Sequence, residues 1–400
     1  MELSFTAFER KAVWSLASIF ALRLLGLFMI LPIFSGYANT LTGATHQKVG
    51  FALGIYGLLQ ACLHIPFGWL SDKFGRYPLL IVGLSSFIVG SITAAFASDI
   101  NSFILARALQ GAGAIGSVLL ASVTDVIREE LRLQAITYVG MSIGCSFILA
   151  LILGPVLNSV LGVPALFALM AILGAGAICL LKPLSAQLKN LAEKPQSASN
   201  IWKDLKEVLC TTQVIRLNLG VLILHATLTA LFLVVPSWLS ERTGSAKLWQ
   251  VYVPVLLGAL LLALPALRAR ARKTEILYKN FKAAIGVLFV SLLILLFAQS
   301  FYITMLLGLT LYFSAFYVLE SQLPALVSKF APTQLRGSAL GMYASAQFLG
   351  IFLGGSLGGW LNQHFGRLSV VAFCGIIMLL WLYVAFKPVA ATTPFKQSAI

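Results

Sequence analysis

Twelve long apolar stretches, separated by shorter segments that carry charged residues, glycine or proline, set the pattern of this sequence. The first six lie near residues 12–35, 49–70, 77–97, 102–126, 135–157 and 163–181, and the other six near 214–238, 249–267, 283–300, 302–328, 338–361 and 367–387. Each is close to the roughly 20 apolar residues that an α-helix needs to cross a bilayer. The pattern predicts an all-α integral membrane protein with twelve transmembrane helices.

The first apolar stretch has to be distinguished from a secretory signal peptide, which also lies at the N-terminus. It is too long for one, it contains Arg23, and no small-residue cleavage site precedes the next stretch. We therefore expect it to be retained as the first membrane helix.

One long polar segment, residues 182–213, interrupts the apolar pattern. It divides the chain into an N-terminal six-helix bundle (1–181), a cytoplasmic linker (182–213) and a C-terminal six-helix bundle with a short tail (214–400). Apolar positions near 202–209 share one helical face. This part of the linker fits a short helix on the membrane surface or a solvated connector equally well.

Composition and charge exclude a soluble enzyme and set the topology. In 400 residues, 59% are hydrophobic, 10% are charged, and the mean hydropathy is +0.94. The formal charge of +15 would suit a nucleic-acid partner, but the positions of the charges give another explanation. Of the 28 Lys and Arg residues, 22 lie in termini and loops on the membrane side of the two termini, four lie in loops on the other side, and two lie inside helices. Because positive loops stay in the cytoplasm, we expect both termini there and no nucleic-acid partner.

The segment between the second and third helices carries the most informative motif. Gly68 permits close packing at a helix end, Gly75 permits a turn, and Asp72 and Arg76 can make charge and helix-dipole contacts. On physical grounds alone, this is a capped, positively charged loop. Its spacing, however, matches the pattern GxLaDxxGRxxxL, and in this the sequence resembles the major facilitator superfamily.

Two further elements resemble that superfamily. Residues 107–114, from Arg107 to Ala114, are similar to its RxxQGxGA element, and Gly154-Pro155 resembles the start of the element associated with antiporters. Asn158-Ser159 stands where a glycine pair is usual in that element. Gly154 also lies 200 residues before Gly354 in a similar small-residue pattern, which fits an internal duplication or ordinary close packing of membrane helices.

Within the superfamily, residues 21–32 and 318–324 are similar to bacterial proton-coupled transporters of the YajR type. The chain differs from that type in two places. The loop 267–273 keeps positive charge without the Gly/Asp pattern of the first motif, and the chain ends at Ile400, where YajR-type proteins usually carry a small cytoplasmic domain.

The resemblance implies a mechanism and a gate. Two bundles alternately open a central cavity, lined mainly by helices one, four, seven and ten, to either side of the membrane. In the gate, the resemblance implies that Arg76 pairs with Asp125 and that Asp72 faces the start of the eleventh helix, which latches the outward-facing state.

Five ionisable residues lie inside the predicted helices: Arg23, Arg107, His225 and Glu320 fall one each on those four helices, and His64 lies on the second. A charge near the bilayer centre costs about 2.5–3.5 kcal/mol on insertion scales, so such groups usually face water or one another. We expect His64 to be a core residue and the other four to be candidates for function.

Glu320 is the one acid among thirteen that lies well inside a predicted helix, about 12 Å from its cytoplasmic end. It can carry protons, or it can be a permanently paired carboxylate that fixes helix packing. His225 can relay protons or bind substrate, or be a hydrogen-bonded core histidine.

The two arginines have similar alternatives. Arg23 can contact an anionic substrate or form a structural or gating ion pair with Glu320. Arg107 can line the cavity or, near the outer end of its helix, bind backbone carbonyls.

Motifs for other chemistry are absent from the sequence. It has no Walker loop, HExxH or Cys/His cluster, and four of its five cysteines lie in apolar runs, which predicts core thiols. We therefore expect no cofactor, no metal and no enzyme activity. The sequence favours a monomeric secondary transporter in the lipid of a bacterial inner membrane, which exports a small amphipathic compound in exchange for protons. A nutrient uptake symporter or facilitator is the alternative, and a transport-inactive scaffold or sensor is the alternative from another class.

Overall fold

The computed structural model describes residues 4–190, 206–207, 211–244, 247–268, 274–297, 301–331 and 335–387. Its helices are α1 (Ala7–Met29), α2 (Leu31–Ala38), α3 (His46–Phe74), α4 (Arg76–Ala95), α5 (Ile100–Ala112), α6 (Gly116–Val126), α7 (Glu129–Leu161), α8 (Val163–Leu181), η1 (Lys182–Leu184), α9 (Ser185–Asn190), α11 (Thr212–Thr243), α12 (Leu248–Arg268), α13 (Thr274–Phe297), α14 (Tyr302–Phe330), α15 (Arg336–Phe365) and α16 (Arg367–Phe386). Within these ranges there is no strand, and twelve segments are long and apolar enough to cross a membrane. The all-α fold with twelve spans is confirmed.

Two of the predicted spans are broken helices. The first is interrupted at Ile30 between α1 and α2, and Pro32 lies in the first turn of α2. The fourth is interrupted between α5 and α6, where Gly113 leaves the helical conformation. Hydropathy did not show these breaks, because the sequence is apolar on both sides of each.

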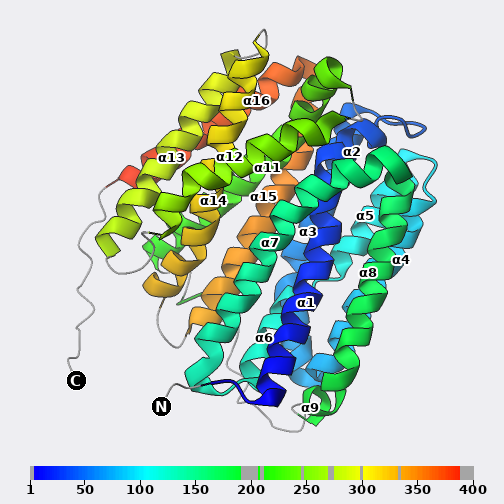
Figure 1. Cartoon of the computed structure of the whole chain (residues 1–400), viewed down its shortest axis with the longest axis vertical. Coiled ribbons are helices and arrows are strands. Elements are labelled where there is room, and N and C mark those ends of the chain that lie inside the picture. The colour runs from blue at the N-terminus through cyan, green and yellow to red at the C-terminus, as the bar shows by residue number, and fades with distance from the viewer. Residues whose placement is uncertain are drawn as a thin grey trace.

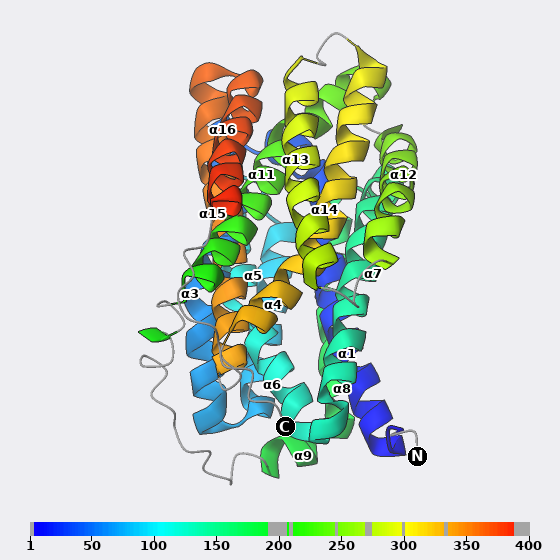
Figure 2. The same ribbon diagram turned by 90° about the vertical axis from the view of Figure 1, so that its left-hand side faces the viewer.

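Close backbone contact between α3 and α15 marks one end of the molecule. We call the end where α1 begins and α16 ends the inner end, and the opposite end the outer end; Figure 1 shows the N-terminus and α9 together at the inner end. In the outer part, α3 and α15 are in backbone contact, and only glycine leaves room for this. If Gly50 carried a Cβ atom, that atom would lie 2.6 Å from the Cα of Gly359, and a Cβ atom on Gly54 would lie 2.8 Å from the carbonyl oxygen of Phe352. Figure 2 shows α3 and α15 running side by side.

The inner parts of the long helices lack such contacts. A Cβ on Gly337 or Gly341 of α15, or on Gly140 or Gly144 of α7, would have nothing within 4 Å. The chain is therefore closed across α3 and α15 in its outer part, and these four glycines take no part in a comparable contact.

The glycines of α7 and α15 make equivalent contacts in the two parts of the chain. Gly154 of α7 touches the backbone of Met29 at the end of α1, and Gly354 of α15 touches the backbone of Ala226 in α11. Pro155 continues α7 beyond this contact. The arrangement fits an internal duplication, since the fifth span packs on the first as the eleventh packs on the seventh.

Some expectations are wrong or fall outside the described residues. Cys62, Cys145 and Cys179 are exposed on their helices, so only Cys374 is a core thiol among the described cysteines. Most of the proposed surface helix near 202–209, most of the loop 267–273 and the C-terminal tail lie outside the described residues. The bundle boundaries 1–181, 182–213 and 214–400 stay a prediction.

Candidate functional site

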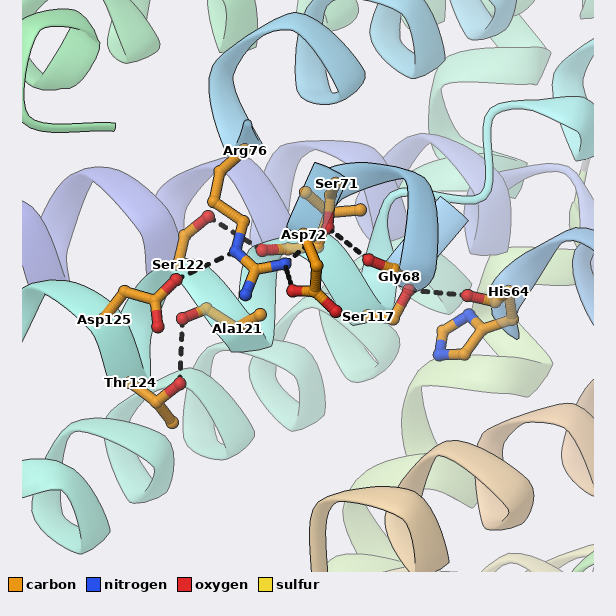
Figure 3. Close-up of polar contacts among 11 residues, drawn as sticks. His64, Gly68, Ser71, Asp72, Arg76, Ser117, Ala121, Ser122, Thr124 and Asp125 are labelled. Carbon is orange, nitrogen blue, oxygen red and sulfur yellow. Dashed lines mark hydrogen bonds and ion pairs between the residues drawn. The ribbon is translucent and has the colours of Figure 1, made fainter. Parts of the chain in front are cut away.

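The inner ends of α3, α4 and α6 meet at one buried arginine. Gly75, with φ of 91°, allows the sharp turn that ends α3 and starts α4 at Arg76. The Arg76 Nε donates to Asp125 Oδ2 at 2.8 Å, its Nη1 donates to Ser71 Oγ at 2.6 Å, and Asp72 forms a further ion pair with it. Figure 3 shows Arg76 reaching between Asp125 and the end of α3.

This cluster fixes three helix ends to one another. Ser71 also donates to the carbonyl of Gly68, which joins the end of α3 to the same network. The side chains of Arg76 and Asp125 are 9% and 12% exposed, so their pair is shielded from water, whereas that of Asp72 is 50% exposed. Arg76 pairs with Asp125, as the resemblance implied, but it does so here with the outer end closed, so the latching of the outward-facing state by this pair stays a prediction. Asp72 pairs with Arg76, and its expected contact with the start of α15 stays a prediction for another conformation.

A second cluster lies midway along the second part of the chain, where α11, α14 and α15 meet. Gln347 of α15 donates from Nε2 to Glu320 Oε1 of α14 at 3.4 Å, and the same nitrogen lies 2.7 Å from Nε2 of His225 on α11. Nδ1 of His225 faces the Val221 carbonyl at 3.2 Å, so we assign the proton to Nδ1 and leave Nε2 to accept from Gln347. His225 Nε2 is 3.6 Å from Glu320 Oε2.

The Gln347 amide therefore bridges the carboxylate and the imidazole with its two hydrogens. His225 is buried, but the Glu320 side chain is 35% exposed, and Glu320 Oε2 has no hydrogen-bond partner among the described residues. The buried hydroxyls of Tyr317 and Tyr343 also lack partners there. Glu320 Oε2 is itself buried, so the carboxylate is partly exposed and keeps one enclosed oxygen with unused acceptor capacity, which can take up a proton, a water molecule or a substrate donor.

Sequence reasoning missed Gln347 because it considered only ionisable side chains. Gln347 is an uncharged amide halfway along the predicted eleventh helix. A search for every strongly polar side chain inside the spans would have found it.

Aromatic side chains lie on the outer side of Glu320. The ring of Phe316, one turn before Glu320, lies 5.7 Å from that of His225 and stacks on Phe147 of α7 at 5.5 Å. Phe147 in turn meets Phe28 of α1 edge-on at 4.8 Å. This row of rings joins the two parts of the chain between Glu320 and the outer end.

Arg23 does not pair with Glu320, and the ion-pair interpretation is wrong for this structure. Its Nη2 donates to the carbonyl of Gly113 at 2.7 Å and to the hydroxyl of Tyr56 at 3.3 Å. Gln60 Nε2 donates to the carbonyls of Gly111 and Gly113, at 2.9 and 3.3 Å. These carbonyls end α5 and have lost their helical partners, so Arg23 and Gln60 stabilise the break in the fourth span.

Arg107 is buried in the core and donates to no backbone carbonyl in this structure, whereas its expected place along the cavity stays a prediction. Its guanidinium carbon lies 5.0 Å from the ring centroid of Tyr56 and 5.5 Å from that of Phe34, and its Nη1 donates to Gln110 Oε1 at 2.7 Å. His64 is also buried, as expected for a core residue.

No group of three or more His, Cys, Asp or Glu side chains in the described part of the chain is arranged to hold a metal ion. The two polar clusters, at Arg76 and at Glu320, are thus the candidate sites.

Comparison with known proteins gives the family. The sequence-family model described as Major Facilitator Superfamily matches residues 16–355 of this chain. The chain belongs to the major facilitator superfamily. It is 36% identical to the Inner membrane transport protein YajR of Escherichia coli K12, over 94% of this chain and 83% of that protein. It is 27% identical to the Multidrug transporter MdfA of Yersinia pestis (strain Angola), over 82% of each chain.

Solved structures confirm the fold of this transporter. The nucleoside transporter NupG aligns with a TM-score of 0.69 at 13% identity, over 94% of this chain and 97% of that one. A bacterial homologue of the human lysosomal transporter Spinster, inward-facing and occupied, aligns with a TM-score of 0.70 at 14% identity, over 96% and 97%. The chain is a multi-pass membrane transporter and not an enzyme.

Proposed function

We propose that this transporter exports a small amphipathic compound in exchange for protons, by alternating access. The observation that carries the proposal is the Glu320 cluster. A partly exposed carboxylate, held beside His225 by Gln347, lies on the inner side of the aromatic row and of the closed contact between α3 and α15. A group in this position can exchange protons with one side of the membrane at a time.

The proposed cycle begins with Glu320 protonated and the inner end open. Loss of the proton to the cytoplasm leaves a carboxylate that is costly to enclose unless a partner neutralises it, so substrate binding is favoured at that moment. After the change of conformation, a proton from the outside replaces the substrate. One charge moved across 100 mV supplies about 2.3 kcal/mol, more than the roughly 1.4 kcal/mol needed for a tenfold gradient.

The topology supports export across a bacterial inner membrane. We propose that the inner end lies in the cytoplasm, because 22 Lys and Arg residues fall on that side and four on the other. The six-helix bundles 1–181 and 214–400, joined by the linker 182–213, would then act as the moving parts of a monomer. The pair of Arg76 and Asp125 would hold the inner end of the first bundle rigid.

The surroundings of Glu320 support an amphipathic substrate. Phe316 and Phe147 offer apolar faces, and the Tyr317 and Tyr343 hydroxyls offer unused hydrogen-bonding capacity. The relative from Yersinia pestis is named as a multidrug transporter, which agrees with this class of compound.

Reconstitution in liposomes with an enclosed pH-sensitive dye tests the proposal. Addition of amphipathic amines, acids and neutral compounds, one at a time, should identify a compound whose entry raises the internal pH, since exchange moves protons outward. A fall in internal pH that liposomes without the protein do not show would indicate symport instead. Entry without any proton movement would show a facilitator and refute proton coupling.

A further inference from the structure

The inner ends of α11, α13 and α16 bring cationic side chains together on the outside of the helix bundle, away from Glu320. Lys282 lies within the membrane-spanning range Leu277–Phe297 of α13. Its Nζ is 4.9 Å from the ring centroid of Tyr278 and 5.1 Å from that of Phe386 on α16. The two rings hold the ammonium group between neighbouring helices.

Two further cations complete the group. Lys387, directly after α16, places its Nζ 5.8 Å from the ring centroid of Tyr383. Arg216, in the first turns of α11, donates from Nη1 to the carbonyl of Lys387 at 3.2 Å. Since α16 packs against both α11 and α13, we treat Arg216, Lys282 and Lys387 as one cationic cluster.

No ion pair joins this cluster to any acid whose side chain the structure describes. The ion pairs found among the described residues involve Arg76, Arg128, His225 and Arg367, and none of the three cations of the cluster takes part in one. A cation at membrane depth normally has an anionic partner or reaches water. Beside the cluster, α16 exposes an apolar stripe that includes Ile376, Leu380 and Tyr383.

We infer that the cationic cluster binds the headgroup of an anionic phospholipid, with the acyl chains along the exposed stripe of α16. The phosphate supplies the missing negative charge, and the lipid-facing rings of Tyr383 and Phe386 keep the ammonium groups at headgroup depth. A lipid fits better than free phosphate because the cations adjoin apolar surface that only acyl chains would cover. The inference depends on the membrane location of the chain and not on proton coupling.

Lipid binding by the purified full chain in neutral detergent tests this inference. Dioleoyl phosphatidylglycerol is the probe, retained lipid is counted by native mass spectrometry, and thermal unfolding is followed during the titration. We expect saturable binding and a rise in Tm that phosphatidylcholine with the same chains does not give. Lys282→Gln and Lys387→Gln should each weaken the apparent affinity roughly fivefold, and Lys282→Arg should retain it.

Lys11→Gln is the matched control, because Lys11 is an exposed lysine near the inner end of α1, in the other part of the chain. It should bind the lipid as the wild type does. An equal loss in Lys11→Gln, equal binding of phosphatidylcholine, or the same stabilisation by inorganic phosphate alone would overturn the inference. If Lys282→Gln does not fold, the exposed Lys387→Gln and the charge-retaining Lys282→Arg still decide it.

Discussion

Replacement of Glu320 by glutamine separates the role of its charge from its role in packing. Glutamine keeps the shape of the protonated acid and an oxygen that can accept from Gln347, but it cannot release a proton. The contact at risk is a single hydrogen bond of 3.4 Å. Its change should alter the free energy of unfolding by less than about 1 kcal/mol, so Glu320→Gln should fold and insert as the wild type does.

The effect on coupled transport is much larger. If one proton moves per substrate, a difference of one pH unit is worth about 1.4 kcal/mol and drives about tenfold accumulation, and two units drive about a hundredfold. Without a titrating carboxylate the accumulation ratio should fall to about one at either gradient. Exchange of substrate for substrate should persist, provided that the carboxylate is not itself a required substrate contact.

The assay is uptake of labelled substrate into proteoliposomes at imposed differences of zero, one and two pH units. Glu241→Gln is the matched control, because it removes a carboxylate that is 56% exposed and paired with Arg367 at the outer end. This control should accumulate substrate as the wild type does. Accumulation by Glu320→Gln equal to the wild type would make Glu320 structural, and the proton site would then be sought at Asp72 or Asp125.

Three further predictions concern the gate, the outer closure and the topology. Asp72→Asn should lower transport at least tenfold while expression and substrate affinity are kept, since the expected contact of Asp72 with the start of α15 forms in one state only. A wild-type transport rate would refute the proposed latch. Gly50→Val inserts a side chain against Gly359, and overpacking of about 1–3 kcal/mol should favour the outward-open state roughly 5- to 150-fold. Spin labels at the outer ends of α3 and α15 should then move apart, and an unchanged distance would contradict the closure. A C-terminal reporter active only outside the cytoplasm should stay silent, because activity would contradict the positive-inside topology.

The spans could be predicted from the sequence because hydropathy over about 20 residues is a strong and local signal. The gate motif could be predicted equally well, because Gly68, Asp72, Gly75 and Arg76 lie within nine residues and their spacing sets their geometry. The partner of Arg23 was not predictable in this way. Its carbonyl acceptor exists only because the fourth span breaks at Gly113, and a break inside an apolar stretch leaves no trace in hydropathy.

The Glu320 cluster shows a different limit, because its geometry depends on how three distant helices pack. Gln347 contacts Glu320 and His225 in the second part of the chain, while the next residue, Phe348, packs its ring 6.3 Å from Tyr56 and 6.2 Å from His64 on α3. Adjacent residues of α15 thus touch the carboxylate cluster on one side and the other part of the chain on the other. Any motion that separates α3 from α15 must break the contacts of Phe348 with Tyr56 and His64, one residue away from the amide that holds Glu320 beside His225. In the proposed cycle, this turn of α15 places the contact between the two bundles directly beside the group that carries the proton.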